Sequence, residues 1–412
     1  MDQNKQLWKE FIVSLVAIFF MATGTGAYLL LMVLYLEHLG FPVSTIGSLK
    51  SLLSITEGVV VILIVLFFKG HHTRPILLMA ILLQISGILI YASQPVNWLI
   101  WAATLLTGCG LGFLLIILFA LPMQKRPGPV HMGMAVGLYT ALIAAGNALG
   151  SFVGGWSADN LGFYASFGIA AGFMAVVFAC MLLITDVHRI EPPLPSEENS
   201  ESLPVQSKPV IHLTWRVGVV AGFALASMSV VYETIFPIFA LRVLALTTTF
   251  VGTLAAIELV MAAAIRPLMG MALKRIKSKS MTIASLAAQA LFLCLIPLIG
   301  STFLLPVTIG MMGLSFGIGR VSSETLTMEG ISGAQLISKR LSSYRLAMIV
   351  GQTLTPLAAG WAADHWGLQS TMIFMPYLIL ILFFSAMTVS LRPDFFSRLV
   401  LKLRWGGTPA GR

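Results

Sequence analysis

We identify six charged residues inside long apolar segments of this 412-residue chain as candidates for chemistry. They are Lys50, Glu57, Glu233, Glu258, Arg320 and Glu324. A charge inside a membrane span is costly, so it usually faces a cavity or a partner. Burial disfavours the charged form of a carboxyl group, so Glu57, Glu233 and Glu258 could take up and release protons near neutral pH. The alternative is that each carboxyl is held in a structural ion pair or hydrogen bond between two helices.

Arg320 carries a planar array of donors that suits a carboxylate or a phosphate. It lies four residues before Glu324, so the two side chains could instead pair on one helix face. Lys50 lies near the end of its apolar segment, where its long side chain could reach the membrane surface. Other polar and aromatic side chains could complete a binding cavity, although each could equally make a structural contact between helices. These are Tyr28, Tyr35, Tyr232, Asn147 and Gln352.

The composition indicates which elements position these residues. Apolar residues make up 58% of the chain and charged residues only 10%, whereas soluble domains carry about 25% charged residues. This excludes a large soluble globule and intrinsic disorder, and it predicts an all-α integral membrane protein with twelve transmembrane helices. We expect them near 11–36, 44–68, 75–93, 98–122, 131–155, 163–185, 215–241, 249–270, 280–300, 303–327, 341–363 and 369–391.

One connection differs from the others. Residues 186–214 are rich in Pro, Ser and Glu and have no apolar period, which is typical of a flexible linker. We therefore expect an N-terminal bundle of six helices over 1–185, a cytoplasmic linker over 186–214, a second bundle over 215–391 and a cytoplasmic tail over 392–412.

The residues that give the chain its net charge of +9 are distributed unevenly between the connections on the two sides of the membrane. Lys and Arg gather at the termini and in alternate connections, whereas the opposite connections hold Arg242 together with Glu37, Asp159 and Asp364. Positive residues mark the cytoplasmic side of membrane proteins. We therefore expect a multi-pass protein of the inner or plasma membrane with both termini in the cytoplasm. The charge does not indicate binding to nucleic acid.

Two segments of the chain repeat each other. Residues 146–162 and 351–367 match in Gly, Trp and Asp at a constant offset of 205, and Tyr139 and Tyr344 share this offset. Equivalent positions in two groups of six helices imply a duplication and a pseudo-two-fold axis along the membrane normal.

With these features the chain resembles the major facilitator superfamily over essentially its whole length. The fifth apolar run is similar to the G-x8-G-x3-G-P-x2-G-G pattern of the proton-driven drug antiporters in that superfamily. The matching positions are Gly137, Gly146, Gly150, Ser151 in place of the Pro, Gly154 and Gly155, with Pro356 and Gly360 in the second copy. Small residues let helices approach closely, and the resemblance implies that this packing serves gating between the halves. It also implies that the seventh and tenth helices line the cavity, which favours Glu233 and Arg320 as cavity residues.

We therefore expect a proton-coupled secondary transporter that works by alternating access and exports an amphipathic or zwitterionic small molecule. Proton-coupled uptake of an amino acid or other metabolite is the alternative, and a non-transporting receptor or scaffold is a third possibility. The sequence has no ATP-binding motif, no spacing for a metal site and no catalytic constellation. We expect no enzyme activity, no metal and no cofactor beyond a proton gradient. The expected partners are the substrate, protons and the lipid bilayer, with the chain a monomer.

Overall fold

The computed structural model describes residues 2–67, 73–93, 96–124, 132–184, 214–273, 275–299, 301–329 and 334–390. Within these ranges, twelve helices are long and apolar enough to cross a membrane, as predicted. The expected tail over 392–412 lies outside the described residues, and so does the expected linker except for Thr214, which begins a helix.

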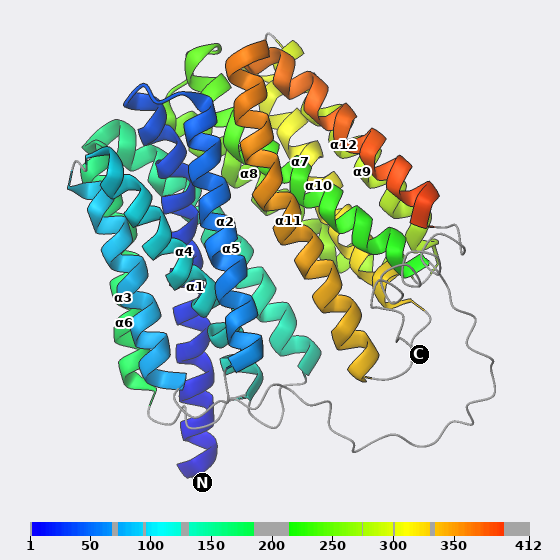
Figure 1. The fold of residues 1–412 in the computed structure, drawn as a ribbon. Helices are drawn as coiled ribbons and strands as arrows, with labels where there is room; N and C mark the ends of the chain where they lie inside the picture. Colours follow the sequence, from blue (N-terminus) through cyan, green and yellow to red (C-terminus); the bar gives the residue numbers. More distant parts are fainter. Residues whose placement is uncertain are drawn as a thin grey trace, which may run out of the picture.

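The N-terminal half packs as one bundle of six helices (Figure 1). In it, α1 packs against α5 and α6, α3 against α4 and α6, and α2 against α4. The helices are α1 (Asp2–His38), α2 (Val43–Phe67), α3 (Thr73–Ala92), α4 (Asn97–Gln124), α5 (Met132–Leu161) and α6 (Phe163–Leu183).

The C-terminal half repeats this arrangement, with α7 in the central position of α1. Here α7 packs against α10, α11 and α12, and α10 packs against α8 and α9. The elements are α7 (Thr214–Arg242), α8 (Thr248–Ala272), α9 (Ser278–Leu295), the 3-10 turn η1 (Ile296–Leu298), α10 (Leu304–Met328), α11 (Ala334–Trp366) and α12 (Leu368–Ser390).

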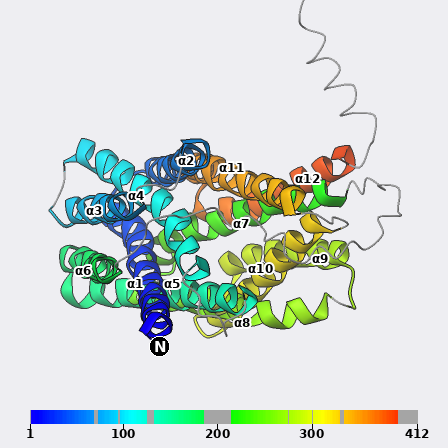
Figure 2. The same ribbon diagram turned by 90° about the horizontal axis from the view of Figure 1, so that it is seen from below.

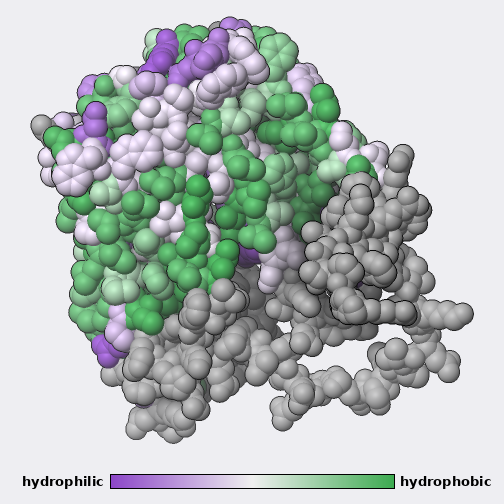
Figure 3. Space-filling view, in the orientation of Figure 1, coloured by the Kyte–Doolittle hydropathy of each residue, from purple (hydrophilic) through white to green (hydrophobic). Residues whose placement is uncertain are grey.

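Two pairs of helices join the halves. Helix α5 packs against α8, and α2 packs against α11. Figure 2 shows α3 and α6 at one edge of the molecule and α9 and α12 at the other, with the joining helices between them. Green apolar residues cover the middle of the face in Figure 3 and purple polar residues gather at its top, as suits a membrane-spanning molecule.

The glycine pattern on α5 serves two different contacts. A Cβ on Gly150 would lie 2.1 Å from the carbonyl oxygen of Thr23 on α1, and Gly146 and Gly154 face the same helix. A Cβ on Gly155 would instead lie 2.4 Å from the carbonyl oxygen of Thr248 on α8. The pattern therefore packs mainly within the N-terminal half, and only part of it meets the other half. No contact of Gly137 is described.

The positions at the joint between the halves are equivalent in the two copies. A Cβ on Gly252 of α8 would lie 2.5 Å from the carbonyl oxygen of Ser151, and a Cβ on Gly47 of α2 would lie 2.1 Å from that of Pro356. Gly360 likewise faces the start of α2. Because side chains at Gly47 and Gly252 would clash with backbone, both joints need glycine. The two joints are one repeat offset apart, which supports the duplication inferred from the sequence.

The two ends of the molecule differ. In Figure 1 the halves come together at the top, and the C-terminal half leans away from the N-terminal half toward the bottom. We call the end that holds the connections after α1, α5, α7 and α11 the closed end, and the opposite end, which carries the N-terminus, the terminal end. Gly162 and Gly367, one repeat offset apart, turn the chain at the closed end with φ of 82° and 84°.

Candidate functional site

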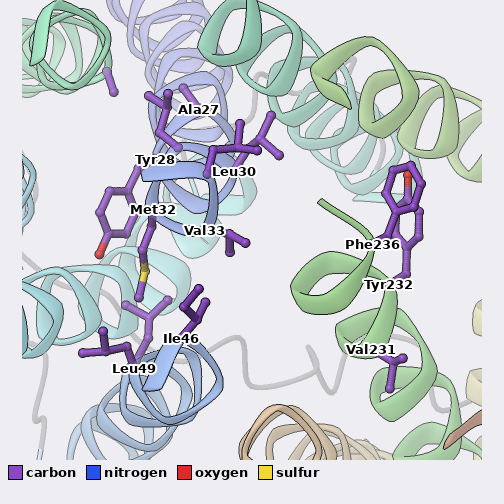
Figure 4. Packing of buried hydrophobic residues seen from close by; sticks show 14 of the residues in the cluster. Ala27, Tyr28, Leu30, Met32, Val33, Ile46, Leu49, Val231, Tyr232 and Phe236 are labelled. Carbon is purple, nitrogen blue, oxygen red and sulfur yellow. The ribbon is translucent and has the colours of Figure 1, made fainter. Parts of the chain in front are cut away.

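A cavity of about 130 Å³ lies between the two halves. Helices α1, α2 and α5 line it on one side, and α7 and α8 line it on the other. Its walls are mostly apolar, and the stacked rings of Tyr232 and Phe236 on α7 lie 4.9 Å apart, with Leu30 on α1 across from them (Figure 4). The polar residues that line it are Lys50, Asn147, Ser151, Tyr232, Glu233 and Glu258.

An ion pair crosses this cavity from one half to the other. Lys50 Nζ on α2 lies 3.7 Å from Glu233 Oε2 on α7, and the Ser229 hydroxyl donates a hydrogen bond of 3.0 Å to Glu233 Oε1. The Lys50 side chain is 7% exposed and that of Glu233 is 44% exposed. Lys50 therefore does not extend to the membrane surface. Its charge is balanced inside the protein by a carboxylate that remains open to the cavity.

Glu258 lies in the same cavity but is buried, with 6% of its surface exposed. Beside it, the Tyr232 hydroxyl is buried and has no hydrogen-bond partner among the described residues. Burial without a partner is costly for a hydroxyl. The cavity therefore presents two carboxyl groups, one of them paired with Lys50, and a free hydroxyl between apolar walls, which suits a small molecule with a cationic group.

A second charged cluster lies on α10, outside the residues that line the cavity. Arg320 Nε donates to Glu324 Oε1 at 2.7 Å, so the predicted alternative of an Arg–Glu pair on one helix face is confirmed. The Arg320 guanidinium lies 5.7 Å from the centre of the Tyr344 ring, and the Tyr344 and Ser323 hydroxyls are hydrogen-bonded at 2.9 Å.

Four other candidates lie away from the cavity. Tyr28 is buried inside the N-terminal half, where its hydroxyl hydrogen-bonds to that of Thr107 at 2.9 Å. Tyr35 packs its ring against those of Tyr91 and Phe167 in the same bundle. Glu57 is half-buried on α2, and Gln352 lies on α11 without lining the cavity.

Two intramembrane arginines are missing from the charges identified in the sequence. Arg266 and Arg345 lie within the expected runs 249–270 and 341–363, so a complete count of charges in those runs would have found them. Arg345 is the charged residue that interacts with Glu57. Arg266 Nε is buried and has no hydrogen-bond partner among the described residues.

The closed end is held by two aspartates, each of which caps a helix of the opposite half. Asp159, in the last turn of α5, accepts hydrogen bonds from the backbone N–H groups of Thr248 and Thr249 at the start of α8. Asp364, in the last turn of α11, accepts equivalent bonds from Val43 and Ser44 at the start of α2. The first N–H groups of a helix lack partners within it, so a carboxylate there is stabilising.

A sequence model of the Major Facilitator Superfamily matches residues 14–334. The chain belongs to this superfamily. Two known structures share this fold with 14% sequence identity to this chain. The nucleoside transporter NupG matches with a TM-score of 0.70 over 95% of this chain and 100% of its own. A POT family transporter in complex with 5-aminolevulinic acid matches with a TM-score of 0.72 over 94% of this chain and 96% of its own. No curated protein matches the sequence.

Membership of the major facilitator superfamily makes the chain a multi-pass membrane transporter and not an enzyme. In this transporter, one further ion pair joins the halves at the closed end. Arg242 Nε at the end of α7 donates to Glu37 Oε1 at the end of α1. The two residues are 205 positions apart, which is the repeat offset, so the pair joins equivalent positions across the pseudo-two-fold axis.

We expect the Glu37–Arg242 ion pair to form also when the two residues are exchanged. Glu37 is 9% exposed and Arg242 is 41% exposed. Arg242→Gln should therefore destabilise the closed end by roughly 1 kcal/mol, because it leaves a buried carboxylate without its partner. Since the positions are equivalent, the double variant Glu37→Arg/Arg242→Glu should recover most of this loss. Thermal unfolding of the purified variants measures both changes. A swapped variant less stable than Arg242→Gln would contradict this assignment.

Proposed function

We propose that the protein is a proton-coupled secondary transporter that exports an amphipathic small molecule with a cationic group in exchange for protons. The observation that carries this proposal is that Glu233 and Glu258 share one mostly apolar cavity between the two halves. Alternating access would open the cavity first to one side of the membrane and then to the other as the halves rock.

Exchange follows from competition at the carboxyl groups. A carboxylate that has taken up a proton no longer attracts a cationic group, and a carboxylate paired with a cation holds its proton less readily. Substrate and proton would therefore occupy Glu233 and Glu258 in turn. The Lys50–Glu233 pair supplies a resting state for the empty cavity, because the ammonium group of Lys50 satisfies the carboxylate until substrate or proton replaces it.

The conformation of the structure suits loading from the cytoplasm. The contacts at Asp159, Asp364 and Glu37 close one end, and the chain's Lys and Arg gather toward the other. With the positive residues inside, the terminal end faces the cytoplasm. A substrate to be exported would then enter the cavity from that side.

Transport by purified protein in liposomes tests the proposal. A panel of amphipathic amines, zwitterions, amino acids, nucleosides and peptides is tested with an imposed pH gradient, and a pH-sensitive dye reports proton movement. We expect at least one cationic or zwitterionic compound to move against the direction of the protons. Movement in the same direction as the protons would favour uptake. If no compound moved under the pH gradient, the proposed proton-coupled exchange would be contradicted.

Neutralising Glu258 is expected to uncouple substrate movement from the proton gradient. Glu258→Gln keeps the size of the side chain but cannot release a proton. Gradient-driven transport should fall by about 100-fold, the lower range for losing one proton-transfer group, whereas exchange of labelled for unlabelled substrate should persist. Glu329→Gln makes the same change at an exposed position at the end of α10 and is the control. Wild-type gradient-driven transport in Glu258→Gln would remove this residue from coupling.

A further inference from the structure

Arg266 is a part-buried arginine on α8, within the C-terminal half. Its Nε lies buried with no hydrogen-bond partner among the described residues. An arginine keeps its charge at any physiological pH, and a buried donor without a hydrogen-bond partner is costly. An anionic group that accepts a hydrogen bond from this Nε would therefore be stabilising.

The packing of α8 against α10 locates this arginine. A Cβ on Gly313 would lie 2.4 Å from the carbonyl oxygen of Glu258, and a Cβ on Gly317 would lie 2.4 Å from that of Ala262. Both helices run from the closed end toward the terminal end, so the next turn places Arg266 against the turn of α10 that begins at Arg320. Arg266 interacts electrostatically with Arg320 and Glu324 on α10, which agrees with this register, and also with Glu258 on its own helix.

The charges of this second cluster do not balance. Arg320 is already bonded to Glu324 at 2.7 Å, so Glu324 is shared between two guanidinium groups. The cluster of Arg266, Arg320 and Glu324 therefore has one excess positive charge. Tyr344 borders the same cluster, with its ring 5.7 Å from the Arg320 guanidinium, and adds no charge of its own when protonated.

The cavity has the opposite excess. It holds Lys50, Glu233 and Glu258, and thus one more negative than positive charge when both carboxyls are ionised. Along α8, eight residues separate Glu258 from Arg266, which is about 12 Å. A zwitterion that spans both clusters would neutralise each of them and leave the net charge of the site unchanged.

We propose that Arg266, assisted by Arg320, binds the carboxylate of a zwitterionic substrate whose cationic group lies at Glu233 and Glu258. This inference rests on the proposed transport function and names the substrate class. The two charges of such a substrate are separated by several bonds, because the two clusters are two turns of helix apart. An α-amino acid, which carries both charges on neighbouring atoms, reaches only one cluster.

Binding of matched probes to the purified full-length protein tests this assignment. The probes are 6-aminohexanoate, which carries both charges, and hexylammonium, which lacks the carboxylate. We expect wild-type protein to bind 6-aminohexanoate at least tenfold more tightly by calorimetry. Arg266→Gln should abolish this preference without weakening the binding of hexylammonium. Arg275→Gln, at an exposed position just beyond α8, is the control and should keep the preference.

The variant Arg266→Lys keeps the test decisive if Arg266→Gln does not fold. It keeps the positive charge but loses the planar pair of donors, so it should retain only part of the preference. The assignment is overturned if Arg266→Gln keeps the wild-type preference, or if wild-type protein binds both probes equally or binds neither. Failure of the transport function would look different, since no compound of the liposome panel would then move with the proton gradient in any variant.

Discussion

Replacing Asp159 and Asp364 together with asparagine is expected to open the closed end of the transporter. Each carboxylate uses both of its oxygens, since Asp159 receives bonds of 3.1 and 2.6 Å from Thr248 and Thr249, and Asp364 receives bonds of 3.0 and 2.9 Å from Val43 and Ser44. Asparagine has one acceptor oxygen and no charge, so one bond and the attraction to the helix dipole are lost at each site.

The size of this effect follows from where the caps lie. A lost N-terminal cap costs about 1 kcal/mol. Losing the cap of an ordinary helix lowers the stability of the folded protein. Here each aspartate caps a helix of the opposite half, so losing it weakens the contact between the two halves at the closed end instead. Two lost caps amount to about 2 kcal/mol, or roughly a 30-fold shift in population toward the state open at this end.

Distances between spin labels at the closed end measure the shift. Cysteines are introduced at Ser93 and Phe303, exposed positions in opposite halves and outside the gate contacts, after Cys109, Cys180 and Cys294 have been replaced. The double variant should show a second, longer distance that wild-type protein lacks. Asn160→Ala is the matched control, because the Asn160 side chain donates to the Trp156 carbonyl oxygen in its own helix and makes no other bond to the described residues. An unchanged distance distribution in the double variant would show that the caps do not hold the gate.

The closed end was partly foreseeable from the sequence. The matching of Asp159 with Asp364 at the repeat offset was visible, but both were expected in connections, and the structure places them in the last turns of α5 and α11. Their acceptor role depends on backbone N–H groups at the start of α8 and α2, which have no signature in residue type. The Glu37–Arg242 pair has the repeat offset but unlike residues, so a comparison of identical residues does not find it.

It was harder to predict from the sequence which face of an enclosed helix lines the cavity. Tyr28 and Tyr35 lie on α1, which is enclosed by other helices, so apolar residues surround its axis and no hydrophobic period marks the side toward the cavity. Both tyrosines point into the N-terminal bundle instead. On α7, which is enclosed in the same way, Glu233 was expected in the cavity because it is charged and because the family resemblance placed this helix there. Arg320 was expected there on the same grounds but does not line the cavity.

The internal repeat relates the residues that hold the closed end, but it does not relate the charged residues of the cavity. The gate residues occupy equivalent positions in both copies, because two halves that close on each other need matching surfaces. The charged cavity residues do not, since Lys50 corresponds to Ala255, Glu233 to Tyr28, and Glu258 to an apolar residue in α2. A substrate with unlike ends has no such symmetry, so the site that binds it must depart from the repeat. The contacts at the closed end thus follow the repeat, whereas the charged residues of the cavity depart from it.

Removing the Glu233 carboxylate is expected to affect both stability and coupling, and a second substitution should separate the two effects. Glu233→Gln leaves the buried ammonium group of Lys50 without its partner. We expect a loss of about 2 kcal/mol in stability, less than the 3–5 kcal/mol typical of a fully buried pair, because Glu233 is partly exposed. Gradient-driven transport should be abolished, whereas exchange of labelled for unlabelled substrate should persist.

The double variant Lys50→Met/Glu233→Gln distinguishes the structural from the functional role of the pair. It removes both charges, so thermal unfolding should return close to the wild-type temperature, as expected when a buried ion pair is replaced by uncharged residues. Coupling should not return, because no proton site is restored at Glu233. Lys277→Met, at an exposed position before α9, controls for loss of a lysine. Recovery of gradient-driven transport with stability would mean that the pair only joins the halves and that Glu258 alone carries the proton.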